Sequence, residues 1–143
     1  MITKKKIFLY LLLSYIFTVS GFAQEKFVQS GIATYYSDAF QGRFTTSGEK
    51  YNNKLYTAAH TTLPFHTIVK ITNLKNNKWV IVKINDRCPK KYYRIIDLSK
   101  AAAKQIDIIT SGVANVKLEV INLSDLNVIT NAPDSLFKMP PEK

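Results

Sequence analysis

Carboxylate and imidazole side chains, which often transfer protons in enzymes, occur at four places in this sequence that have polar or turn-like surroundings. Glu49 lies in a run rich in Ser, Thr and Gly, and His60 follows two alanines. Asp86 ends an apolar run, and Asp97 stands just before Leu98-Ser99. These residue types suit general acid–base chemistry, provided that the fold brings them together.

Each of these residues also has a structural interpretation. Glu49 fits a solvated surface acid, and His60 fits a core histidine with satisfied hydrogen bonds. Asp86 stands beside Arg87, where a structural salt bridge is common, and Asp97 precedes an expected helix whose dipole favours an acid. The residues taken one at a time leave both interpretations open.

Other chemistries are less well supported. His60, His66, Glu49 and Asp86 lack the spacing of His-Glu-x-x-His metal ligands, and no Gly-x-Ser-x-Gly sequence marks a hydrolase serine. Cys88, the only cysteine, has no partner for an internal disulfide, and a free Cys is commonly a buried apolar residue. We expect no metal, no cofactor and no catalytic role for Cys88.

Short segments of alternating or β-branched residues predict the strands that position these groups. The clearest signal is a hairpin, in which Thr67–Leu74 and Trp79–Asn85 alternate apolar and polar residues on either side of Lys75–Lys78. Ser99 is placed to cap a helix that runs through three alanines to about Ile106. Further ordered segments are expected at Ser30–Tyr36, Tyr56–His60, Arg94–Leu98 and Val113–Leu123.

This order of elements predicts a mainly β fold with one or two short helices, in one domain at 24–123. Several short strands are typical of a small closed barrel, because closure removes exposed strand edges. Residues 37–53 are rich in Gly, Ser, Thr and Asn and show no period. They are expected to form a long surface loop, and loops of that length often carry function.

The first 23 residues have the pattern of an export signal. Lys4–Lys6 precede the apolar run Ile7–Val19, and Gly21–Ala23 supplies small residues for a signal peptidase. We expect cleavage after Ala23 and a secreted or periplasmic product without stable membrane insertion. An uncleaved anchor is the alternative, although the apolar run is shorter than the about 20 residues that span a bilayer. No Cys lies near Ala23, so no lipid anchor is expected.

The charge of the mature chain favours an anionic partner. Removal of the three signal lysines lowers the formal net charge from +10 to +7. Outside the inner membrane this favours a polymer such as the cell wall, and the sequence has no recognition-helix or aromatic RNA-binding pattern, so no nucleic acid is expected. The polar, proline-containing segment 124–143 is expected to be a flexible tail.

Several short motifs, taken in order, resemble the rare lipoprotein A family over about residues 30–121. The motifs are Gly31-Ile-Ala-Thr-Tyr-Tyr36, Phe40-Gln-Gly-Arg-Phe-Thr-Thr-Ser-Gly-Glu49, Thr57-Ala-Ala-His-Thr-Thr-Leu-Pro64, Val69 to Leu74, Val82-Lys-Ile-Asn-Asp-Arg87 and Arg94-Ile-Ile-Asp-Leu-Ser99-Lys-Ala-Ala-Ala103. Three residues depart from the family pattern: Cys88, His66 and Tyr93 each stand where Gly is usual.

The resemblance implies a six-stranded double-psi β-barrel with a groove for glycan strands. It also implies lytic transglycosylase activity on peptidoglycan, with 1,6-anhydromuramic ends as products and a preference for strands stripped of their peptides. The functional Glu, His and Asp of the family fall on Glu49, His60 and Asp86. A related transglycosylase barrel places its acid at the position of Asp97, where expansins also keep an Asp.

We therefore expect Asp97 to be the acid, with Asp86 orienting it or stabilising positive charge on the sugar. Glu49 and His60 would position sugar hydroxyls. Further substrate contacts are expected from Tyr36, Arg43, Thr46 and Arg87. The expected partner is a peptidoglycan strand, bound by a monomer. The alternatives are an expansin-like wall-binding module that breaks no bond and, with support only from fold analogy, a secreted inhibitor.

Overall fold

The computed structural model describes residues 26–91 and 93–122. The predicted signal peptide at 1–23 and the predicted tail at 124–143 lie outside the described residues. Within the described part, no helix is long and apolar enough to span a bilayer. Its elements are β1 (Val28–Tyr35), the 3-10 turn η1 (Asp38–Phe40), β2 (Thr57–His60), β3 (Ile68–Asn73), β4 (Trp79–Asp86), β5 (Arg94–Leu98), α2 (Lys100–Gln105) and β6 (Ala114–Val120).

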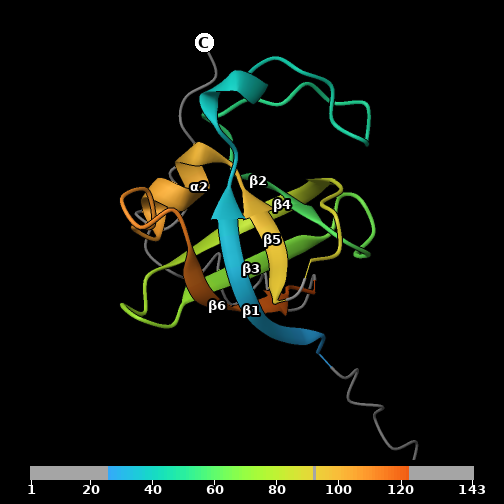
Figure 1. Cartoon of the computed structure of the whole chain (residues 1–143). Helices are drawn as coiled ribbons and strands as arrows, with labels where there is room; N and C mark the ends of the chain where they lie inside the picture. Colours follow the sequence, from blue (N-terminus) through green and yellow to red (C-terminus); the bar gives the residue numbers. More distant parts are fainter. Residues whose placement is uncertain (1–25, 92, 123–143) are drawn as a thin grey trace, which may run out of the picture.

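The six strands form a closed barrel in the order β1-β5-β2-β4-β3-β6, with β6 returning to β1 (Figure 1). β1 runs parallel to β5, and β2 runs parallel to β4, whereas the other four pairs are antiparallel. The predicted mainly β, six-stranded barrel is confirmed, and so is the predicted hairpin, which is formed by β3 and β4. β1 begins at Val28, two residues before the predicted start, because its first residues pair with β6.

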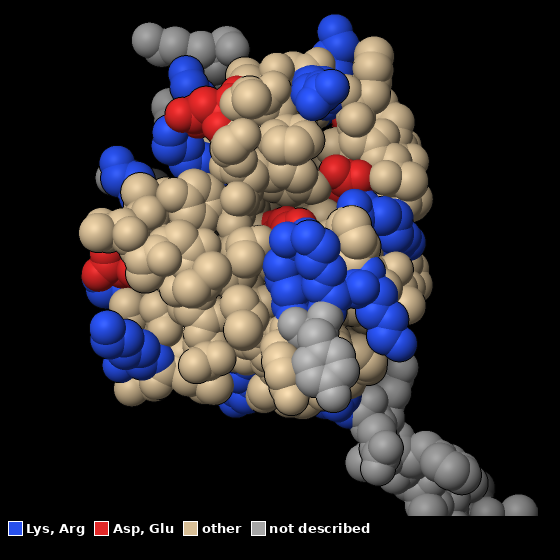
Figure 2. Space-filling model, in the orientation of Figure 1, with Lys and Arg blue, Asp and Glu red and all other residues tan. Residues whose placement is uncertain are grey.

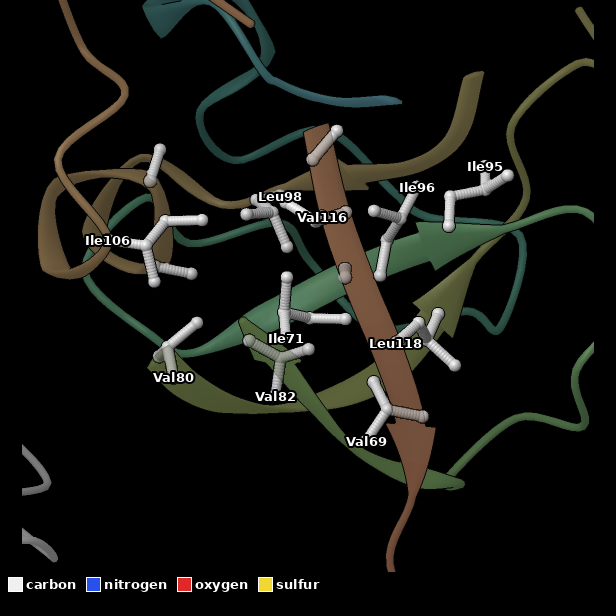
Figure 3. Packing of buried hydrophobic residues seen from close by; sticks show 14 of the residues in the cluster. Val69, Ile71, Val80, Val82, Ile95, Ile96, Leu98, Ile106, Val116 and Leu118 are labelled. Carbon is white, nitrogen blue, oxygen red and sulfur yellow. The ribbon is translucent and has the colours of Figure 1, made fainter. Parts of the chain in front are cut away.

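The barrel interior is filled by the apolar residues of strands in which apolar and polar residues alternate. In β3, and in β4 as far as Ile84, every second residue is buried, as expected of a strand with one face in the core, and Asn85 at the end of β4 is buried as well. Figure 3 shows the side chains from several strands converging on one interior. The fully buried members include Val69, Ile71, Val82, Ile84, Ile96, Leu98, Ile106, Val116 and Leu118. Ser99 caps α2, since its side chain accepts a hydrogen bond from the Ala102 amide.

Two irregularities in strand pairing lie next to the predicted functional residues. The β1/β5 register shifts between Ile32 and Ala33, and the β2/β4 register shifts between Ala58 and Ala59. Bulges of this kind re-aim side chains and are frequent beside active sites. After the second shift, Ala59 pairs on one side with Asp86 of β4 and on the other with Asp97 of β5.

His66 and Tyr93, which stand where the family usually has Gly, both adopt left-handed backbone conformations, with φ of 68° and 66°. This region costs a residue with a side chain roughly 1–2 kcal/mol, which is the physical reason for Gly at such positions. The His66 amide donates to the Ile84 carbonyl at 2.7 Å, so the turn holds despite that cost. The departures leave the barrel intact.

Candidate active site

An open pocket of ≈ 640 Å³ lies at the ends of β1, β4 and β5, under the loop that follows β1. Figure 2 shows acidic surface set into a hollow on this face, with Lys and Arg side chains beside it. The lining residues come from four stretches of the chain: Thr34–Ser37, then Phe40, Arg43 and Phe44, then Asp86, Arg87 and Pro89, and finally Arg94 and Asp97. The two predicted Asp residues therefore share one pocket.

The pairing of β2 with both neighbours explains how Asp86 and Asp97 meet. Each is the partner of Ala59, on opposite sides of β2. Strands in a sheet lie about 4.8 Å apart, so the two backbones are separated by roughly 10 Å. Two Asp side chains that both reach into the pocket from there can flank a sugar ring.

Asp86 is saturated with hydrogen bonds. Its Oδ1 accepts from the Thr46 amide at 2.8 Å, the Thr46 hydroxyl at 2.7 Å and the Arg87 amide at 2.8 Å, and its Oδ2 accepts from the Tyr36 hydroxyl at 2.6 Å. Burial opposes ionisation of Asp86, but these donors outweigh burial and hold the pKa of the carboxyl below its ordinary value. Burial and then the bond to Asp86 raise the pKa of Tyr36, which stays protonated as the donor.

Asp97 has fewer partners. The Thr34 hydroxyl donates to Oδ1, and Arg94 Nη2 donates to Oδ2 at 3.0 Å. The Asp97 side chain is 15% exposed, and it reaches the pocket from β5 between these two neighbours. Arg94 Nε is buried and has no hydrogen-bond partner within the described residues, so the guanidinium is incompletely satisfied.

Glu49 lies outside the residues that line the pocket. Its carboxylate accepts from Lys83 Nζ at 2.9 Å and Asn85 Nδ2 at 3.0 Å, and His66 Nδ1 lies 3.8 Å away. The bond from Asn85, then that from Lys83, lower the pKa of Glu49. The same loop is tied to β4 by the Ser47 amide, which donates to the Asn85 carbonyl. Glu49 thus fastens the loop that carries the pocket wall.

His60 also lies outside the pocket lining and is 2% exposed. Its Nδ1 accepts from the amides of Thr62 and Leu63, at 3.2 and 3.0 Å, and its Nε2 lies 3.0 Å from Gln29 Oε1. Burial, and then the charge of Arg87, lower the pKa of His60. Of the four residues predicted to act together, the structure brings Asp86 and Asp97 into one pocket and keeps Glu49 and His60 out of it.

The predicted substrate contacts divide in a similar way. Tyr36, Arg43 and Arg87 line the pocket, whereas Thr46 lies outside the lining and donates to Asp86. Sequence reasoning missed the aromatic wall formed by Phe40 and Phe44, the latter 74% exposed.

It also missed Thr34 and Arg94, both of which bind Asp97. Arg94 and Asp97 stand three residues apart in one strand, where alternation places side chains on opposite faces. Only the motif shared with the family pointed to Arg94.

Comparisons with known proteins identify the family of this chain. A family model described as lytic transglycolase matches residues 28–118. The chain belongs to the rare lipoprotein A (RlpA)-like family. The endolytic peptidoglycan transglycosylase RlpA of Campylobacter jejuni is 56% identical over 97 residues, which cover 68% of this chain and 35% of that protein. RlpA of Pasteurella multocida is 50% identical over 113 residues, covering 79% and 37%. The chain thus spans about a third of the length of these relatives.

Solved structures confirm the fold of this RlpA-like domain. The Streptomyces papain inhibitor aligns with a TM-score of 0.55 and 22% identity, over 67% of this chain and 96% of that one. The expansin of Clavibacter michiganensis aligns with a TM-score of 0.55 and 17% identity, over 68% and 52%. At these identities the likeness concerns fold alone, and it confirms the double-psi β-barrel predicted from the motifs.

Proposed function

We propose that this domain binds peptidoglycan glycan strands outside the inner membrane and cleaves them as a lytic transglycosylase. The observation that carries the proposal is the pair of Asp86 and Asp97, which flank Ala59 in one open pocket of an RlpA-like barrel. The relatives named above are transglycosylases acting on peptidoglycan, which supports the same substrate here.

The lytic reaction needs one proton-carrying acid. Asp97 donates a proton to the glycosidic oxygen as the bond from that oxygen to C1 breaks. The 6-hydroxyl oxygen of the same sugar then bonds to C1, and its proton passes to the Asp97 carboxylate. The products are a 1,6-anhydro end and a strand with a free hydroxyl, and the acid is regenerated. Hydrolysis would instead require a second carboxylate to activate or replace water.

The hydrogen-bond donors around the two carboxyls favour this assignment. Two donors to Asp86 are backbone N–H groups, of Thr46 and Arg87, which can donate but never accept. Together with the hydroxyls of Thr46 and Tyr36, they give the charged form of Asp86 four donors. Within the described residues Asp97 has two donors, the Thr34 hydroxyl, which can reverse and accept, and Arg94 Nη2, which can only donate. Protonation of Asp97 therefore disturbs fewer hydrogen bonds, which suits the proton-carrying role, and the charged Asp86 suits stabilisation of positive charge at C1.

Substrate binding is assigned to the walls of the pocket. Tyr36 offers a hydroxyl, and Arg43 and Arg87 offer guanidinium groups to sugar oxygens. The exposed ring of Phe44 suits stacking against the apolar face of a sugar. Glu49 contributes by fastening this loop to β4 through Lys83 and Asn85.

Mass analysis of peptidoglycan digests tests the proposal, with intact and peptide-stripped strands compared. Wild-type protein should release anhydromuramic ends, and Asp97→Asn and Asp86→Asn should each lower the rate by about 10²–10⁴-fold while retaining strand binding. Asp107→Asn is the matched control, because Asp107 is 68% exposed and lies outside the pocket lining. Full activity in both pocket variants would refute the mechanism.

The second candidate is a wall-binding module that breaks no bond. The exposed aromatic wall beside the pocket favours it, because sugar stacking alone would serve binding. The products separate the candidates. Reducing ends would indicate hydrolysis, and strand binding with no new ends would indicate a binding module.

A further inference from the structure

The guanidinium of Arg87 lies at the pocket and, among the residues that the structure describes, has no carboxylate partner. Its Nη1 donates to the carbonyls of His60 and Asp86, at 3.3 and 3.4 Å, and its Cζ lies 4.0 Å from the centroid of the Phe65 ring. Arg94, by contrast, is paired with Asp97. Within the described residues, Arg87 is therefore positioned by a ring face and two long bonds, and it keeps N–H donors available for a ligand.

Phe65 belongs to the segment between β2 and β3, and His60 shapes that segment. The His60 ring receives the amide hydrogens of Thr62 and Leu63 on one nitrogen and faces the Gln29 side-chain oxygen with the other. Accepting at Nδ1 requires the proton to sit on Nε2, which then donates to Gln29. Both nitrogens are occupied and the ring is buried, so no atom of it is placed to exchange a proton with a sugar.

We propose that His60 is a positioning residue, which folds the 61–66 segment so that Phe65 holds Arg87 in the pocket to contact oxygen atoms of the glycan. The inference rests on the proposed function, since the contact is to the same strand. It assigns to His60 a role in substrate binding through Phe65 and Arg87, in place of the proton transfer or direct sugar contact expected from its residue type.

The decisive variants separate hydrogen bonding from titration. His60→Asn keeps an oxygen acceptor close to the position of Nδ1 but removes the titratable ring. His60→Gln keeps a donor near the position of Nε2 but loses the Nδ1 acceptor. Phe65→Leu leaves His60 intact and removes only the ring face under Arg87, with Phe27→Leu as its control because Phe27 is exposed and outside the pocket lining.

Release of anhydromuramic ends from peptide-stripped strands is measured against strand concentration and pH, at temperatures below unfolding. His60→Asn should rescue kcat/KM to within about threefold of wild type with an unchanged pH profile. His60→Gln and Phe65→Leu should each raise KM by about tenfold with little change in kcat, a factor equivalent to about 1.4 kcal/mol. The double variant His60→Gln/Phe65→Leu should have a KM only slightly above that of Phe65→Leu, because both changes act through Arg87.

A loss of about 10²-fold or more in kcat for His60→Asn, with a shifted pH profile, would overturn the inference in favour of proton transfer. Wild-type KM for Phe65→Leu would overturn it as well, even if His60→Gln fails to fold. Should wild-type protein release no anhydro ends, the proposed function fails, and retention on peptide-stripped strands becomes the measurement. Weaker retention of His60→Gln and Phe65→Leu than of wild type and His60→Asn would then support the positioning role. Equal retention of all four proteins would refute it.

Discussion

Asp86 does more than face the pocket, because it ties the loop between η1 and β2 to the end of β4. We therefore expect Asp86→Asn to destabilise the fold as well as lower the rate. An Asn oxygen can still accept the three bonds that Asp86 Oδ1 receives, and the Asn amide can donate to the Tyr36 oxygen. The change thus removes charge while preserving shape.

The size of the effect follows from the number of bonds. A hydrogen bond to a charged group is worth about 1 kcal/mol more than a neutral one. Four such bonds converge on Asp86, and relief of the burial cost of its charge offsets part of their loss. We expect a net loss of about 2 kcal/mol, which for a domain of about 100 residues lowers Tm by roughly 8–16 °C.

Thermal unfolding followed by circular dichroism at pH 7 measures this loss. The control is Asp107→Asn, whose side chain makes one exposed ion pair with Lys78 and should shift Tm by little. The pKa of Asp86 is lowered in the folded state, so its contribution is complete above the unfolded value of 3.8. The gap between wild type and Asp86→Asn should therefore narrow as pH falls below 3.8. A Tm indistinguishable from the Asp107→Asn control would refute the reasoning.

Three other changes test separate parts of the structure. Gly31→Ala would place a Cβ 2.6 Å from an Ile95 methyl and 2.8 Å from the Tyr93 carbonyl oxygen. It should therefore lower the free energy of unfolding, measured with denaturant, by about 1–3 kcal/mol, and an unchanged midpoint would contradict that packing. Cys88→Ser should keep anhydro-end release within about tenfold, because burial raises the pKa of this thiol and an acid mechanism needs no sulfur; a far larger loss with the fold intact would contradict this. The pKa of His60 is lowered on folding, so the free energy of unfolding should fall as pH drops below about 6.5. His60→Asn should reduce this dependence on pH, and an equal dependence in both proteins would rule out His60 as its source.

Local pattern was enough to predict most elements of the barrel. The alternation in β3 and β4 and the Ser99 cap of α2 are consequences of neighbouring residues, and both appear where they were expected. The pairing of β2 with β4 and β5 has no such local signal. It follows from closure of the barrel, in which a strand finds partners distant in sequence.

The candidate site was harder to predict for the same reason. Asp86 and Asp97 come together across Ala59 only because the β2/β4 register shifts by one residue there, and a bulge leaves no clear mark in the sequence. The environment of His60 depends on the turn that aims two amides at its ring. Residue type alone therefore left both a functional and a structural interpretation of His60 open.

The loop between η1 and β2 carries an acid that holds the structure together, and it contacts an acid of the pocket. The loop donates to Asp86 through Thr46, anchors on β4 through Glu49, and contributes Phe44 to the pocket lining. Loss of an acid that fastens a loop and loss of an acid that moves a proton should both lower the rate, but only the first should also lower the unfolding midpoint and weaken strand binding. Glu49 belongs to the first kind by its contact with Lys83. Asp97, which accepts from Thr34 and Arg94 and from no residue of that loop among the described contacts, belongs to the second. Asp86 has the contacts of both, and so its loss should lower stability and rate together.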